Sequence, residues 1–327
     1  MGRRAIVMIV VLVAQLAICL TVLLVPLEPA LHAAPVTISG PPVVTSALAD
    51  QVNAGPGHPL DAGTATDAQQ ARDDVEQGRA VAAASIDLRL DRTTVFVSSA
   101  QGRVLGDSVT ALVRATAEPF GSAVTTEDVA PLPTGSSGQA GLRLVVVAAV
   151  VLGLGIAVAV TWRRGPVADT WAEALRRMGS AGGVAALASL ALATLAAHHV
   201  GGGVVGWWSV LWLAAVATSA ATLALEGVLG VAGIGLATTV FVAMAAPLAR
   251  IEHPLLLPGP WSVVTPWLPH GAGLDAARQV AWFDGAGAAR PVAVLTSWLV
   301  VSCIVLMVAR RERRRAGVVW RSGARPA

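Results

Sequence analysis

The sequence predicts an α-helical polytopic membrane protein with six transmembrane helices and an inserted extracytoplasmic α/β domain. Hydrophobic residues make up 55% of the 327 positions, and the mean hydropathy is +0.67, well above that of ordinary soluble domains. Charged residues make up only 13% and are clustered between long apolar runs. A helix needs about 20 apolar residues to cross a bilayer, so this pattern favours a protein with several spans.

Six apolar runs meet or nearly meet this length, and none contains Asp, Glu, Arg or His. They are Ala5–Val25, Leu144–Trp162, Ala181–Ala197, Val205–Leu225, Val228–Leu248 and Val292–Val308. The first run follows two arginines and precedes the small residues "ALHAA", so it is either a retained anchor or a cleaved signal peptide. Because the apolar core of a signal peptide usually has about 7–15 residues, we favour the anchor.

The arginines indicate the orientation, because cytoplasmic loops carry an excess of positive charge. The chain has no lysine, and thirteen of its 23 arginines lie in the short segments that are inside when the N-terminus is inside. The absence of lysine and the frequent Ala, Gly and Val suggest a GC-rich bacterial genome. We therefore expect a bacterial plasma-membrane protein with both termini in the cytoplasm. Residues 1–25 form the N-terminal end and first span, 143–309 the other five helices, and 310–327 a basic cytoplasmic tail. We expect this tail to favour anionic lipid rather than nucleic acid.

Residues 26–142 predict a separate α/β domain outside the cytoplasm. Short alternating runs such as "APVTISG" and "TTVFVSS" have strand character, and "TDAQQARDDVEQGR" has helical spacing, with Asp67 as its N-cap. The expected element order is β-α-β-α-β-β-α-β. "PLPTGSSGQAG" is expected to be a flexible linker back to the membrane.

The chain lacks the residues of several common functions. A P-loop needs a lysine, so the chain cannot be a conventional ATPase by itself, and no catalytic set, metal site or cofactor site is evident. Ion-coupled transport needs an ionisable group in the membrane, which disfavours an ion-coupled carrier. The nearest such group is Glu226, in the short turn between the fourth and fifth runs, where we expect it to face the cytoplasm. Nearby glycines, Gly227, Gly230 and Gly233, are expected to let helices approach closely.

The segment "GPVADTWAEALRRMG" predicts a surface helix that begins near Pro166 and ends near Gly179. Its apolar side chains, including Leu175, share one face, and the charged ones lie elsewhere. One interpretation is a helix that rests on the membrane interface. The other is a helix that couples the protein to a cytoplasmic ATPase, for which the candidate residues are Trp171, Glu173, Arg176 and Arg177.

Three stretches resemble the ABC-2 type permease family, in its actinobacterial branch related to phage infection proteins. They are "PALHAAPVTISGPPVVTSALADQVNA", "GRAVAAASIDLRLDRTTVFVSSAQGRVLGDSVT", and "LEGVLGVAGIGLATTVFVAMAAPLA" with the following "LLLPGPWSVVTPWLPHGAGLDAARQVAWFDG". The resemblance implies the membrane subunit of an ABC-2 type exporter, energised by a separate cytoplasmic ATP-binding subunit and assembled as a homodimer or heterodimer. It also implies that the outer connector before the last span, residues 249–291, folds as short helices returning into the outer leaflet.

This connector is rich in residues suited to such a fold. Its prolines interrupt regular helix, and its tryptophans suit the boundary between water and lipid. We expect it either to cap the outer end of a translocation route or to act as a plain interfacial plug. The candidate gate residues are Trp261, Pro266, Trp267, Pro269 and Arg278. The alternative function is a non-transporting scaffold or receptor whose outer domain binds a cell-envelope partner.

Overall fold

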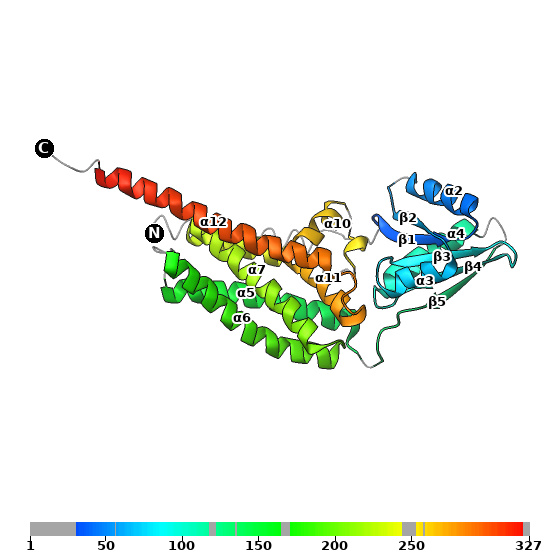
Figure 1. Ribbon diagram of the computed structural model, residues 1–327, viewed down its shortest axis with the longest axis horizontal. Coiled ribbons are helices and arrows are strands. Elements are labelled where there is room, and N and C mark those ends of the chain that lie inside the picture. Colours follow the sequence, from blue (N-terminus) through cyan, green and yellow to red (C-terminus); the bar gives the residue numbers. More distant parts are fainter. Residues whose placement is uncertain are drawn as a thin grey trace.

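The computed structural model describes residues 31–55, 57–117, 122–134, 136–164, 171–243, 253–257 and 259–322 of the chain. The molecule is elongated, with a helical bundle at one end and an α/β domain at the other (Figure 1). The first expected span, Ala5–Val25, lies outside the described residues.

The α/β domain has the predicted element order. Its elements are β1 (Ala34–Ser39), α2 (Pro42–Asn53), β2 (Leu60–Ala65), α3 (Ala68–Glu76), β3 (Ala82–Asp87), β4 (Arg92–Val97), α4 (Arg103–Ala117) and β5 (Ala123–Asp128). The strands form one sheet in the order β2-β1-β3-β4-β5. All neighbouring strands are parallel except the antiparallel pair β3 and β4.

Helices cover both faces of this sheet. Adjacent residues of a strand point to opposite faces, so Ala82 joins the apolar core beneath α2 and α4, whereas Ala83 joins the core beneath α3. Asp67 caps α3 as predicted, because its carboxylate accepts a hydrogen bond from the Gln70 backbone N–H. The order of strands and helices therefore follows directly from the alternating apolar pattern.

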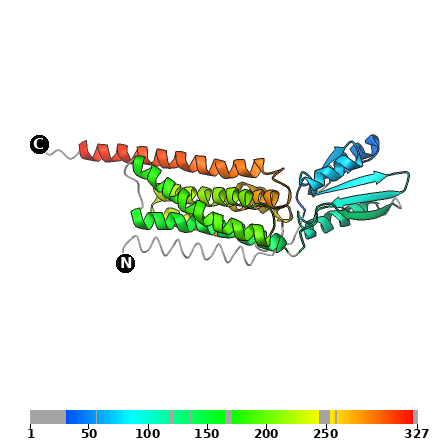
Figure 2. The same cartoon turned by 60° about the horizontal axis from the view of Figure 1, so that its bottom comes forward.

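Four helices in the described part of the chain are long and apolar enough to cross a membrane. They are α5 (Gly138–Arg164), α6 (Trp171–His199), α7 (Val204–Leu229) and α12 (Ala289–Ser322). These helices run side by side, with the α/β domain beyond one end (Figure 2). The apolar stretch of α7 is 67% buried, against 39% for α5, 28% for α6 and 17% for α12. Helix α7 is therefore the centre of the bundle.

Six spans are not confirmed. The expected fifth span, Val228–Leu248, does not begin at Val228, because α7 continues to Leu229 and Gly230 then breaks it with φ at +67°. A separate helix follows, α8 (Val231–Thr238), and it continues as the π-helical turn η2 (Thr239–Ala243). Residues 244–248 of the expected span lie outside the described residues.

Short helical elements precede the last long helix. They are η3 (Pro254–Leu256), α10 (Pro260–Val264), η4 (Thr265–Trp267) and α11 (Pro269–Trp282). A proline lies in the first turn of each element. Backbone N–H groups in a first turn make no hydrogen bond within the helix, so the missing N–H of proline costs nothing there. These elements lie where the bundle meets the α/β domain (Figure 1).

Candidate functional site

Helix α11 is enclosed within the outer end of the bundle, the end that faces the α/β domain. It packs against α5, α7 and α12 together, and ten of its fourteen residues are buried. Two glycines allow close packing of α11, Gly271 against the preceding turn η4 and Gly273 against α5. A Cβ on Gly271 would overlap the Thr265 carbonyl oxygen, and one on Gly273 would lie 3.2 Å from the Val146 side chain. Helix α11 is therefore part of the bundle core and does not simply rest on its surface.

A buried ion pair lies on α11. Arg278 is only 2% exposed, and its guanidinium donates to the Asp275 carboxylate at 3.0 Å, one helical turn away. The pKa of Asp275 is raised because desolvation outweighs the opposing influence of Arg278 and Arg290, although a third of its side chain is still accessible. The candidate gate residue Arg278 therefore carries its charge inside the protein.

His253 faces the same region and is also buried. The pKa of its imidazole is held well below the usual value, first by desolvation and then by repulsion from Arg278. Its Nδ1 accepts the Leu255 backbone N–H at 3.1 Å, which caps η3. A neutral ring therefore suits both its burial and its structural role.

The other candidate gate residues lie at the edge of this cluster. Pro266 and Pro269 stand in the first turns of η4 and α11. Trp267 is 57% exposed, and its carbonyl oxygen accepts the Trp298 indole N–H at 2.7 Å. The Arg290 guanidinium lies 5.8 Å from the Trp267 ring centroid, within cation–π range. Trp261 is partly buried against the main apolar core.

The linker between the α/β domain and α5 is held along much of its length. Gln139 donates a hydrogen bond from Nε2 to the Ala100 carbonyl at 2.5 Å, and the Ser137 backbone N–H donates to the His199 carbonyl at 2.8 Å. The expected flexible linker is therefore wrong for its last part, because α5 already begins at Gly138.

One apolar core crosses the boundary between the two regions. It contains Val81 and Leu105 of the α/β domain together with Trp207, Leu256 and Leu274 of the bundle. The Trp207 indole N–H is satisfied by the Gly201 carbonyl at 2.7 Å. The α/β domain is therefore packed onto the connector and the ends of the spans.

The opposite end of the bundle carries a second polar cluster, built from three helices. Glu226 of α7 is 1% exposed, and its Oε2 accepts the Thr161 hydroxyl of α5 at 2.5 Å. Arg177 of α6 is 5% exposed and donates to Glu173 at 2.6 Å. Arg177 also acts electrostatically on Glu226. The expectation that Glu226 lies in a turn facing the cytoplasm is wrong, because α7 carries it inside the bundle.

The predicted coupling helix also needs correction. Helix α6 runs without a break from Trp171 to His199, so no surface helix ends near Gly179. Leu175 is 53% exposed, whereas Arg177 is buried. In a membrane the exposed face meets lipid, so a charge is better placed among protein partners. Arg176 is exposed, and its Nε donates to the Ala172 carbonyl of its own helix. The Trp171 side chain lies outside the described residues.

The three candidate packing glycines have different surroundings. A Cβ on Gly233 would overlap the Leu225 carbonyl oxygen, so α8 could not lie against the end of α7. Gly230 has open space around it but adopts positive φ in the turn, which favours glycine. A Cβ on Gly227 would lie 3.1 Å from the Leu306 side chain of α12.

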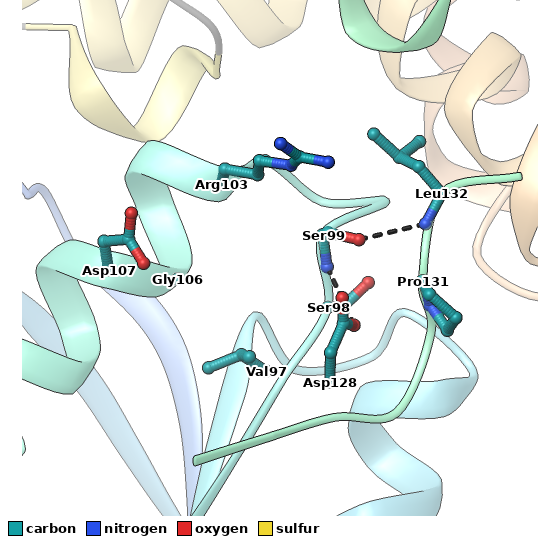
Figure 3. A pocket seen from close by; sticks show the side chains of 10 residues that line it. Val97, Ser98, Ser99, Arg103, Gly106, Asp107, Asp128, Pro131 and Leu132 are labelled. Carbon is teal, nitrogen blue, oxygen red and sulfur yellow. Dashed lines mark hydrogen bonds between the residues drawn. The ribbon is translucent and has the colours of Figure 1, made fainter. Parts of the chain in front are cut away.

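A pocket of about 350 Å³ lies in the α/β domain, beside the start of α4 and the carboxyl ends of β4 and β5 (Figure 3). Ser99 lies at its centre, where its backbone N–H donates to Asp128 and its hydroxyl accepts the Leu132 N–H. Arg103 and Asp107 of α4 contribute opposite charges to the lining. Across the described residues, no group of three or more His, Cys, Asp and Glu side chains is arranged to hold a metal ion.

Sequence reasoning did not identify the pocket or the cluster around Glu226 as sites. Thr161 and Glu226 are 65 positions apart, so no local spacing connects them. The available signal was Glu226 itself, the sole acid between two long apolar runs. Comparisons with protein-family models, curated proteins and solved structures found no match.

Proposed function

We propose that the chain is the membrane subunit of an ABC-2 type exporter, energised by a separate cytoplasmic ATPase. The observation that carries this proposal is α11, a short helix enclosed in the outer end of the bundle just before the last long helix. This is the form that the sequence resemblance implies for the outer connector. The α/β domain between the first two expected spans also supports the proposal.

Helix α11 is suited to close a route through the bundle. It contacts the central helix α7 and also α5 and α12, so material that moves along α7 toward the α/β domain meets α11 first. Its helical form satisfies its own backbone hydrogen bonds, which non-helical backbone at membrane depth does not do. We therefore assign α11 the role of an outer cap that moves during export.

The start of α6 is the proposed contact for the ATPase. Leu175 and Arg176 are exposed there, whereas Arg177 is bound to Glu173 inside the bundle. A partner at this end therefore meets Arg176 directly and senses Arg177 only through movement of the helix.

The test is purification of the tagged chain from its native membranes in a mild detergent, followed by identification of its partners and assay of ATP hydrolysis. A stoichiometric P-loop ATPase is expected with the wild type. Arg176→Ala should reduce its recovery about tenfold, equivalent to about 1.4 kcal/mol. Arg89→Ala, which removes an exposed arginine of the α/β domain, is the matched control and should leave recovery unchanged. Failure to recover an ATPase under conditions that preserve known ABC complexes would contradict the proposal.

The second candidate is a receptor or scaffold, favoured by the pocket in the α/β domain. Its size, about 350 Å³, lies within the range of small-molecule sites, and Arg103 and Asp128 provide charged groups beside it. This candidate predicts that a cell-envelope partner co-purifies without an ATPase and is lost in Arg103→Ala.

A further inference from the structure

The cluster at the end of the bundle remote from the α/β domain contains an incompletely satisfied carboxylate. Glu226 is 1% exposed, and Thr161 donates to its Oε2 at 2.5 Å. Its Oε1 is buried and has no hydrogen-bond partner among the described residues. An ionised carboxylate usually accepts several hydrogen bonds when it is buried. Glu226 therefore has fewer hydrogen bonds than a permanently ionised carboxylate needs.

The charges around Glu226 do not balance if both acids of the cluster are ionised. Arg177 is the positive group that acts on Glu226, but its guanidinium is already bound to Glu173 at 2.6 Å. Among the described side chains, one guanidinium therefore binds Glu173 and acts on Glu226 only electrostatically. A second uncompensated charge inside a membrane bundle is costly.

A proton on Glu226 resolves this imbalance. Arginine does not lose its proton in proteins, and Glu173 retains contact with solvent because its side chain is 28% exposed. Glu226 is the more enclosed of the two acids and is the group that gains most from neutralisation.

Among the side chains that the structure describes, few other titratable groups face this site. Helix α6 contributes Arg177 and Glu173, and the last turn of α5 contributes the exposed Arg163. Helix α8 has no titratable side chain, and the nearby described portion of α12 contributes Cys303. Within this described part of the site, Arg177 is the charged group that acts on Glu226.

We propose that Glu226 is a proton-binding site in the membrane bundle, and that Arg177 exchanges between Glu173 and Glu226 as the proton leaves and returns. When the O–H bond of Glu226 breaks, the proton passes to water and the new carboxylate attracts the guanidinium. Glu173 then loses this partner and is hydrated through its exposed side. Because Glu173 and Arg177 lie on α6 and Glu226 lies on α7, the exchange couples protonation to the relative position of two helices. This inference does not depend on the exporter proposal.

The experiment is infrared difference spectroscopy of the full chain in lipid nanodiscs, from mildly alkaline to mildly acidic pH. The wild type should gain a protonated-carboxyl C=O band that is lost in Glu226→Gln. Arg177→Gln should move its midpoint to higher pH by at least about one unit, because a nearby positive charge favours the ionised carboxyl. Glu173→Gln should move the midpoint to lower pH, because Arg177 then no longer binds a Glu173 carboxylate and its charge acts more strongly on Glu226.

A second pair of variants tests the assignment without removing the carboxyl. Thr161→Val should change the frequency of the band, because it removes the hydroxyl that contacts Glu226. Thr218→Val is the matched control, since Thr218 is also buried in the bundle but donates to the Ala214 carbonyl of its own helix. The proposal is overturned if the band persists in Glu226→Gln, if no such band forms in the wild type, or if Thr161→Val and Thr218→Val behave alike.

Discussion

The two ends of the helical bundle both bury an arginine beside a carboxylate, but they do so in different ways. At the outer end, Arg278 and Asp275 lie one turn apart on α11, so a single helix holds the pair. At the opposite end, Arg177 pairs with Glu173 on α6 and also acts on Glu226 of α7. A pair within one helix stabilises that helix in place, whereas a charge shared between helices responds to their relative movement.

The largest expected losses of stability come from replacing glycines whose Cα lies close to the backbone of another segment. Gly271→Ala at the outer end and Gly233→Ala at the other would each place a Cβ against a backbone carbonyl oxygen. Because the backbone on both sides would have to shift, each substitution should cost about 3 kcal/mol. The measurement is thermal denaturation in detergent, followed by tryptophan fluorescence.

Gly179→Ala is the matched control for both. A Cβ at Gly179 meets nothing within 4 Å, and the residue lies within α6. Alanine is favoured over glycine in a helix by roughly 0.5–1 kcal/mol, so this variant should be as stable as the wild type or more so. Equal destabilisation of all three variants would show that the contacts at Gly271 and Gly233 are not as close as described.

The next largest effect is on stability, and it tests whether the ion pair between Arg278 and Asp275 has a structural role. Asp275→Asn removes the carboxylate from a buried guanidinium that cannot be neutralised, and should cost about 3 kcal/mol. Arg278→Met should cost less, because the remaining Asp275 can take up a proton and its pKa is already raised.

The double variant Asp275→Leu/Arg278→Met completes this cycle. It should recover most of the lost stability, because apolar residues of similar volume often replace a buried ion pair without penalty. If the double variant were less stable than either single variant, the pair would contribute more than a local structural contact.

The smallest expected effect is a dependence of stability on pH at His253. Because its folded pKa is lowered, the unfolded chain binds a proton first as the pH falls below about 6.5. The stability associated with the neutral ring is therefore present above this pH and is lost below it, by up to about 1.4 kcal/mol per pH unit. His253→Asn should flatten the profile, since an asparagine oxygen can also cap η3.

His58→Asn is the control for this measurement. His58 lies exposed in the α/β domain with φ at +44°, a conformation that asparagine tolerates. The variant therefore removes an imidazole without disturbing the turn, and it shows what loss of a histidine outside the bundle does to the profile. An unchanged profile for His253→Asn would contradict the assigned role of His253.

Much of the fold could be predicted because it depends on local patterns. The strand and helix order of the α/β domain and the cap at Asp67 follow from alternating apolar residues and from capping chemistry. The four long helices lie where the apolar runs predict them, although each extends beyond the expected limits. Helix α6 begins at Trp171 and therefore includes Leu175 and the charged residues around it. A membrane helix need not end where charged residues appear.

The polar clusters could not be predicted because they depend on packing between distant segments. Helical periodicity placed Leu175 and Arg177 on different faces but did not show that Arg177 is buried in the bundle. Burial of Arg278 depends on where α11 lies among three other helices, which no single-segment pattern contains. The break at Gly230 depends on a positive φ that many glycines in apolar helices do not adopt.

The central claim is that α11 moves during a cycle driven by ATP at the other end of the bundle. It can be tested by joining α11 to α7 through Gly273→Cys and Ala214→Cys, because a Cβ at position 273 would lie 3.7 Å from that of Ala214, within the disulfide range of about 3.5–4.5 Å. The measurement is ATP hydrolysis by the co-purified complex in liposomes, with each of the two single substitutions as a control. We predict that oxidation suppresses hydrolysis in the double variant alone and that a reductant restores it. Full hydrolysis with the cross-link intact would contradict the claim and leave α11 as a static plug.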